Sequence, residues 1–323
     1  MMESLEETEL CFPQLLNSSC RKPKRSETEA VLVYILLSSI SVLTAALNLL
    51  VIISISHFKQ LQTPTNLLLL SLAVSDFFVG LVMCFQILLS DGCWILSDCT
   101  CTLYGVLDYT ITSASVGTMV LISVDRYVAI CDPLRYSDKV TVRGVVVCSG
   151  LCWVCSLLYN SVVMKENITQ PGRYNSCSGE CVIVINYIAG VIDVMLTFIG
   201  PVSVIIVLYL RVFVVAVSQA RAMRSQRSGT FLAKRSELKA AKTLGVVVVV
   251  FLMCLCPYCC SSLTSQSNSF SATTFPLESW LFYFNSCLNP IIYAFCYPWF
   301  MKSVKLIVTL KILRSDSSET RIL

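Results

Sequence analysis

Seven long apolar runs dominate this chain of 323 residues. Crossing the hydrocarbon core of a membrane takes about 20 helical residues, whereas barrel strands need only about ten alternating ones. Water is absent there, so only helices and closed barrels satisfy their backbone groups. The sequence therefore predicts an all-α membrane protein, a seven-transmembrane helix bundle whose spans lie at residues 31–56, 64–90, 100–124, 144–164, 182–210, 240–263 and 276–297.

The distribution of cations predicts the orientation. With the N-terminus outside, only six of the 24 Lys and Arg residues are external, and an excess of cations marks the cytoplasmic side. We assign the net charge of +4 to this asymmetry and to acidic lipid headgroups, and expect no nucleic-acid partner. No cleavable signal precedes Ala30, so the first span is expected to act as its own insertion signal.

Four segments follow from this pattern. Residues 1–29 form an extracellular N-terminal tail and residues 30–297 form the seven-transmembrane domain. After Pro298 the mixture of aromatic, aliphatic and Lys residues predicts an amphipathic helix on the inner leaflet over 298–310. Residues 311–323 are expected to be a disordered cytoplasmic tail.

Asp108 and Asp193 are acidic residues inside long apolar runs. Neither has a Lys or Arg in its own span to neutralise it. A carboxylate in a membrane costs about 2.5–3.5 kcal/mol even on the lenient insertion scale, so such a residue indicates a functional site. A small amine supplies the missing positive charge, and a diamine supplies it twice.

Cysteines and sequons mark the external side. Cysteines inside the spans are interpreted as packing residues, and we expect no metal site there because no His accompanies them. External cysteines face an oxidising compartment, but their spacing alone does not assign the pairs. The sequons at Asn17 and Asn167 both fall outside and predict glycosylation.

A set of motifs in order along the spans resembles the rhodopsin-like G-protein-coupled receptors over residues 30–305. The set comprises Asn48, Asp76, Asp125-Arg126-Tyr127, Trp153, Pro201, Pro257 and Asn289-Pro290-Ile291-Ile292-Tyr293. The seventh span is similar to the fingerprint of the trace-amine-associated receptors, with Asn285-Ser286, Asn289-Pro290, Tyr293, Tyr297 and Trp299-Phe300.

The resemblance implies an amine-binding site. Asp108 is similar to the aspartate that binds the ammonium group, Tyr283 to the phenol that hydrogen-bonds it, and Trp280 and Tyr258 to the aromatic walls. Thr112 follows Asp108 on the same helix face. Asp193, with Thr197 beside it, resembles the second acid of the diamine-sensing members. Cadaverine and putrescine are the leading candidates, and a monoamine receptor in which Asp193 does not contact the ligand is the main alternative.

The resemblance also implies switching elements. Asp125, Arg126 and Tyr127 end the third span, and Arg126 with Glu237 resembles the charge pair that holds the inactive state; a solvated pair is the plain alternative. Tyr209 and Tyr293 resemble the phenols that meet on activation. Leu255 stands where a tryptophan is usual, so the signal is expected to pass through Phe251, Val116 and Pro201 instead. A set of polar residues resembles the buried sodium site of the family: Asp76, Ser115, Asn285 and Asn289.

The family further implies disulfides and partners. Cys101 pairs with Cys181, and Cys177 pairs with either Cys11 or Cys20, while Cys93 and Cys99 stay unpaired. The implied partners are a stimulatory olfactory G protein that raises cAMP, an arrestin and a receptor kinase. The implied place is the plasma membrane of olfactory cilia. We expect no enzyme activity and no cofactor beyond an allosteric sodium ion, and an amine transporter is a remote alternative.

Overall fold

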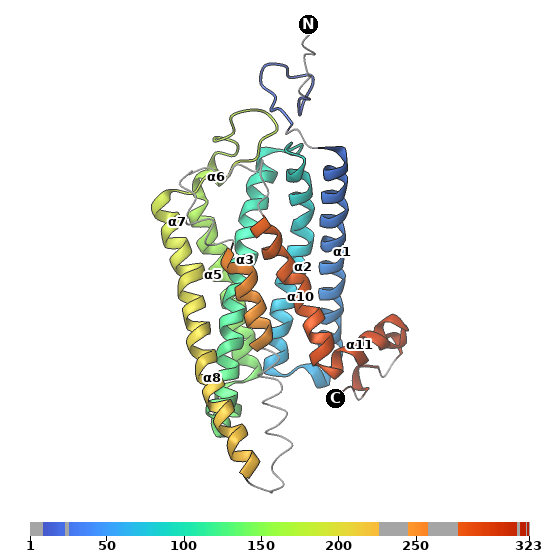
Figure 1. The fold of residues 1–323 in the computed structure, drawn as a ribbon, viewed down its shortest axis with the longest axis vertical. Coiled ribbons are helices and arrows are strands. Elements are labelled where there is room, and N and C mark those ends of the chain that lie inside the picture. Colours follow the sequence, from blue (N-terminus) through green and yellow to red (C-terminus); the bar gives the residue numbers. More distant parts are fainter. Residues whose placement is uncertain are drawn as a thin grey trace.

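Long helices run side by side through the molecule, which is a computed structural model that describes residues 9–22, 26–225, 245–257, 277–314, 317–320 and 322 (Figure 1). The spans are α1 (Glu27–His57), α2 (Pro64–Ser90), α3 (Asp98–Cys131), α5 (Val142–Val163), the fifth span of α7 (Tyr187–Asp193), η3 (Val194–Ile199) and α8 (Gly200–Ser225), the helix Gly245–Pro257, and α10 (Leu277–Cys296). Within the described part, five helices are long and apolar enough to cross a membrane, and six if the bent pair formed by α10 and the helix after it is one span.

Local sequence signals set where the helices begin. Ser26, Thr63, Ser97 and Thr141 are the N-caps of α1, α2, α3 and α5, and each side-chain oxygen accepts a hydrogen bond from a backbone N–H of the first turn. Such caps satisfy donors that the helix itself cannot pair. The predicted starts of the second and fourth spans therefore lie within two residues of the observed ones.

The fifth span differs from its predicted start at residue 182. Residues 182–186 are not helical, and the helix begins only after the N-cap Asn186. The backbone N–H of Val182 donates to Asn175 Oδ1, and that of Val184 donates to Asn167 Oδ1. Side chains of the second external loop thus bind the backbone of an apolar stretch outside the helix, which hydropathy alone does not reveal.

Among the described residues, two large apolar clusters and one small one are buried in the interior. The inner cluster includes Phe58, Met119, Phe251 and Tyr293, and the outer cluster includes Trp94 and other residues near the extracellular end. Short helices complete the ends of the bundle: η1 (Lys59–Leu61), η2 (Pro133–Arg135), α4 (Tyr136–Lys139) and α6 (Lys165–Thr169).

The C-terminal segment begins with α11 (Pro298–Val308), close to the predicted amphipathic helix, which buries Trp299 and Phe300. The tail was expected to be disordered, but its described part forms η4 (Lys311–Leu313) and η5 (Ser317–Glu319) and folds back to the first inner loop. Ile322 is 1% exposed, and Lys59 forms an ion pair with Glu319 at 3.1 Å. Buried apolar area at the tail end accounts for this ordering.

Candidate functional site

Asp108 lies in the outer half of α3 and faces α10. The Tyr283 hydroxyl donates to Asp108 Oδ1 at 3.2 Å, as the resemblance implies for this pair. Asp108 is only partly covered, whereas Tyr283 is 4% exposed. One carboxylate oxygen is therefore fixed by a phenol, and the group remains accessible within the bundle.

Asp193 is the last residue of α7, immediately before the π-helical turn η3. Asp193, Val194, Thr197 and Phe198 are partly covered, whereas the residues between them are exposed. This pattern places Asp193 and Thr197 on the inner face of the span rather than toward lipid. A π turn shifts the side chains that precede it relative to a regular helix, and such turns often occur at functional sites.

Tyr109 and Tyr159 connect the surroundings of the two acids. The Tyr109 phenol on α3 lies within electrostatic range of both Asp108 and Asp193. The Tyr159 phenol on α5 faces the Asp193 carboxyl group. Neither tyrosine was identified from the sequence, because an aromatic residue in an apolar run is not distinctive until the helices are packed.

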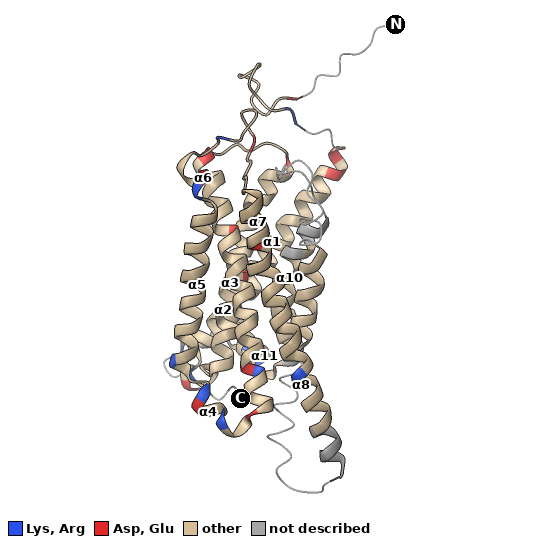
Figure 2. Ribbon diagram, turned by 90° about the vertical axis from the view of Figure 1, so that its left-hand side faces the viewer, with Lys and Arg blue, Asp and Glu red and all other residues tan. Residues whose placement is uncertain are grey.

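Basic and acidic residues are distributed differently along the bundle. In the described part, the Lys and Arg residues gather toward the two ends, while acidic residues also occur at mid-height (Figure 2). Within the described part of the chain, neither Asp108 nor Asp193 forms an ion pair. In that part, therefore, no Lys or Arg neutralises either carboxyl group.

Three predicted residues cannot be placed in the site. Tyr258 and Glu237 lie outside the described residues, and Trp280 belongs to α10 but its side chain is not among those described. Thr112 is partly covered, one turn below Asp108. The aromatic walls of the site and the Arg126–Glu237 pair therefore stay predictions.

Buried oxygens gather around Asp76, which is fully buried on α2. Asn289 Nδ2 donates to Asp76 Oδ2 at 2.8 Å. Asp76 Oδ1, Asn285 Oδ1 and Asn289 Oδ1 are buried without a hydrogen-bond partner. Hard oxygen donors of this kind, one of them a carboxylate, fit a small hard cation such as sodium. Ser115, the fourth predicted member, is buried on α3.

Arg126 is held at the inner end of α3 by neighbours that the motif does not reveal. Its guanidinium group donates to Asp125 Oδ2 and to the Thr65 hydroxyl, each at 2.5 Å. Tyr136 of α4 donates to the other oxygen of Asp125 at 2.8 Å. Arg126 is 6% exposed, so this network ties the inner ends of α2, α3 and α4 together.

The remaining switch residues line the inner core. Tyr209 and Tyr293 have buried hydroxyls without hydrogen-bond partners, and Tyr209 lies within electrostatic range of Arg126. Phe251 and Leu255 both belong to the inner apolar cluster. Tyr127 packs at the inner end, against a small cluster of Ile130 and Val212. Two buried phenols without partners are poised to form hydrogen bonds if the inner ends move.

Within the described part of the chain, three disulfides tie the N-terminal tail and the external loops together. Cys101–Cys181 is present as implied, and Cys20, not Cys11, pairs with Cys177. The expectation that Cys93 is unpaired is wrong, because Cys93 bonds Cys11. Cys99 is free, as expected. The N-terminal tail folds back on itself where Leu10 pairs with Arg21, and Cys11 reaches Cys93 just beyond the end of α2. Spacing along the chain does not encode this proximity.

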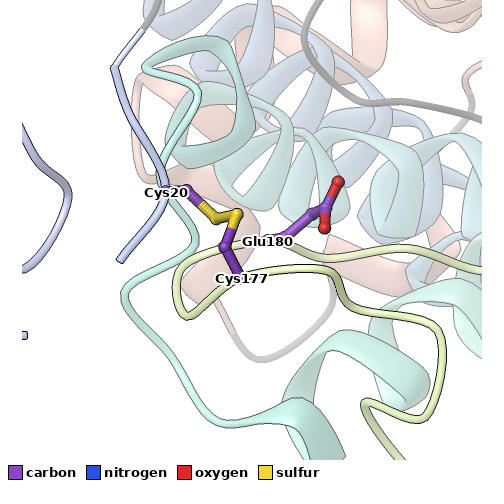
Figure 3. A group of neighbouring side chains, drawn as sticks. All are labelled: Cys20, Cys177 and Glu180. Atoms are coloured by element: carbon purple, nitrogen blue, oxygen red, sulfur yellow. A yellow bond between two sulfur atoms is a disulfide. The ribbon is translucent and has the colours of Figure 1, made fainter. Parts of the chain in front are cut away.

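Cys20 and Cys177 lie beside the Glu180 carboxylate (Figure 3). The two sulfurs are joined in a disulfide, and metals bind thiolates rather than disulfide sulfurs. Glu180 Oε2 accepts hydrogen bonds from the backbone N–H and the hydroxyl of Ser176. The group is a structural link of the loop and does not suit a metal ion.

Asn167 departs from the predicted role as a glycosylation site. Its side chain is 4% exposed, donates to the Val184 carbonyl at 2.8 Å and accepts from the Val184 N–H at 3.3 Å. A glycan requires an exposed amide, so this geometry opposes modification there. Asn17 is exposed on the tail and keeps the prediction of glycosylation.

Residues 47–293 match the sequence model of the family described as 7 transmembrane receptor (rhodopsin family). The fold and the motif positions agree with that match, so the chain is a multi-pass membrane receptor of this class rather than an enzyme. It is 39% identical over 331 residues to trace amine-associated receptor 13c of Danio rerio, covering 98% of this chain and 97% of the relative. It is 40% identical to receptor 8a of Rattus norvegicus over 96% and 95% of the two chains, and 38% identical to receptor 9 of that species over 97% of each. The chain belongs to the trace amine-associated receptors.

Proposed function

We propose that this receptor is activated by short alkyl diamines, one ammonium group bound by Asp108 and the other by Asp193, and that it signals through a stimulatory G protein and cAMP. The observation that carries the proposal is the pair of inward-facing carboxyl groups on adjacent elements, α3 and the fifth span, which flank Tyr109. The names of the relatives support amines as the ligand class.

The energetics favour a doubly charged ligand. An ammonium–carboxylate contact at about 4 Å contributes roughly 4 kcal/mol at an effective dielectric of 20, before desolvation. Two such contacts are of the order of the roughly 8 kcal/mol that corresponds to micromolar binding. A monoamine leaves one buried acid without a cation, which penalises its binding.

A second function has a specific observation in its favour. The Tyr159 phenol faces Asp193 and offers it a hydrogen-bond donor from the protein itself. If Tyr159 satisfies Asp193, the receptor responds to monoamines through Asp108 alone. The two functions differ in how the response depends on Asp193.

A cAMP reporter assay with matched ligands separates them. Cadaverine is compared with pentylamine, and putrescine with butylamine, on cells with equal surface receptor. We expect each diamine to be more potent than its matched monoamine. Asp108→Asn should abolish the responses to all amines. Asp193→Asn should lower the potency of diamines about tenfold or more and preserve the responses to monoamines. Asp91→Asn, at the exposed end of α2, is the matched control. Equal potency of the paired ligands would rule out the two-acid site.

A signal from the site reaches the inner face only if the inner helix ends separate. The Arg126–Asp125–Thr65 network and the buried phenols of Tyr209 and Tyr293 are the contacts that rearrange in this proposal. Separation of these ends would open a groove for the C-terminal helix of the G protein. An arrestin and a receptor kinase would act on the same inner face, and the olfactory cilium is the proposed place of action.

A further inference from the structure

Gln86 is a buried amide on α2 that the amine site described above does not include. Its side chain is 6% exposed, and Nε2 contacts the hydroxyls of Tyr104 on α3 and Tyr283 on α10, the latter at 2.8 Å. Tyr283 in turn contacts Asp108. A primary amide in an apolar span is costly unless it is hydrogen-bonded, so its place beside two phenols and an acid calls for a role.

The orientation of the Gln86 amide sets the direction of this chain, because Nε2 faces the Tyr283 hydroxyl. The Gln86 amide nitrogen carries two protons, and each phenol carries one. When Nε2 donates to the Tyr283 oxygen, the single phenolic proton of Tyr283 remains available for Asp108 Oδ1. In the reversed amide orientation, the Gln86 carbonyl would accept that proton, and Asp108 would face the lone pairs of the Tyr283 oxygen.

Tyr104 keeps Gln86 in place. The Tyr104 ring packs against Phe85 and Trp94 in the outer apolar cluster, with ring centroids at 5.6 and 6.1 Å. The second amide proton of Gln86 points to the Tyr104 hydroxyl. Three helices are thereby joined at one amide, with one end of the chain of hydrogen bonds packed in aromatic rings and the other at Asp108.

We propose that Gln86 is a positioning residue that holds Tyr283 as a hydrogen-bond donor to Asp108 and so keeps this carboxyl group oriented for the ammonium group of the ligand. The inference rests on the proposed function in one respect, that Asp108 binds the amine. Gln86 acts through Tyr283 and does not itself need to touch the ligand. Without the Gln86 amide, nothing in this network fixes the Tyr283 hydroxyl toward Asp108, and loss of the hydrogen bond from Tyr283 to this acid corresponds to a change in potency of about tenfold.

A double-mutant cycle tests the inference, because residues that act through one another have non-additive effects. Gln86→Leu removes both amide protons, and Tyr283→Phe removes the phenol. We expect Gln86→Leu to raise the EC50 of amines about tenfold in the unmodified receptor and less than about twofold in the Tyr283→Phe receptor. Potency is measured with the cAMP reporter at equal surface receptor.

Two further variants keep the test decisive. Met83→Leu, a volume-conserving change at a buried position one turn earlier on α2, controls for disturbed packing and should leave EC50 unchanged. Gln86→Glu keeps the shape but replaces the amide donor with an acceptor, so it should weaken amines at least as much as Gln86→Leu. It replaces Gln86→Leu in the cycle if that variant fails to reach the surface.

The outcomes separate this inference from the proposed function. If Asp108→Asn leaves amine potency unchanged, the proposed function falls, and the inference with it. If Asp108→Asn abolishes the response but the fold-changes of Gln86→Leu and Tyr283→Phe multiply, the inference alone is overturned. A wild-type EC50 for Gln86→Glu overturns it as well.

Discussion

The second external loop depends on Asn167 as a hydrogen-bonding clamp, although this residue lies in a sequon. Its amide pairs with both the N–H and the carbonyl of Val184, at 3.3 and 2.8 Å. Asn167→Ala removes both partners at once. A buried backbone group left without a partner costs about 1–3 kcal/mol.

Val184 is half-buried, so water replaces part of what is lost. We therefore expect Asn167→Ala to destabilise the folded receptor by about 2 kcal/mol in total, toward the lower end for two unpaired groups. The entropy of unfolding is about 2.1 cal/mol/K per residue, so for a chain of 323 residues this corresponds to a fall of about 3 °C in the apparent melting temperature of the solubilised receptor. A thermal-shift assay on purified receptor measures it.

Thr169→Ala is the matched variant. It destroys the same sequon, but the Thr169 hydroxyl only donates to carbonyls of its own short helix, those of Lys165 and Glu166. We expect Thr169→Ala to change neither the melting temperature nor the electrophoretic mobility, and Asn17→Gln to change mobility alone. A mobility shift in Thr169→Ala, equal to that produced by a glycosidase, would show that Asn167 carries a glycan and refute the reasoning.

Further predictions concern the tail, the cation site and the C-terminus. Peptide mapping without reduction should recover Cys11 linked to Cys93, and Cys93→Ser should leave Cys11 as a free thiol; a Cys11–Cys177 peptide in the unmodified receptor would contradict the observed pairing. Asp76→Asn should remove any effect of sodium chloride on agonist affinity, with N-methylglucamine chloride as the control for ionic strength; a sodium effect that survives would exclude Asp76 as the ligand. Ile322→Asp should speed hydrogen exchange around residues 317–322, because burying an unpaired carboxylate at a position that is 1% exposed is costly. An unchanged exchange rate would show that the tail is not docked.

The spans could be predicted because their signal is local. Hydropathy over about 20 residues measures what the membrane itself selects, so the second span is predicted and observed at residues 64–90. The fifth span shows the limit, because polar side chains of the external loop bind the backbone of Val182 and Val184, and the helix begins only after Asn186. Hydropathy does not register hydrogen bonds from a distant part of the chain.

The site could be predicted in part for the same reason. Asp108 and Asp193 stand out in the sequence because an acid in an apolar run is rare, and the inner faces of their helices follow from the described exposure pattern. Gln86 carried a weaker form of that signal, an amide deep in an apolar run, which only its position beside Tyr283 makes meaningful. Tyr159 gave no such signal in the sequence.

By itself, then, the sequence determined the apolar helices that can span a membrane and singled out the acids within them, because solvent preference acts on each residue where it stands. Only the tertiary structure decided that Cys11 meets Cys93, that Asn167 is used as a clamp and that Gln86 reaches Tyr283. These are pairings between residues from 17 to 197 positions apart, and their partners are set by how helices and loops pack.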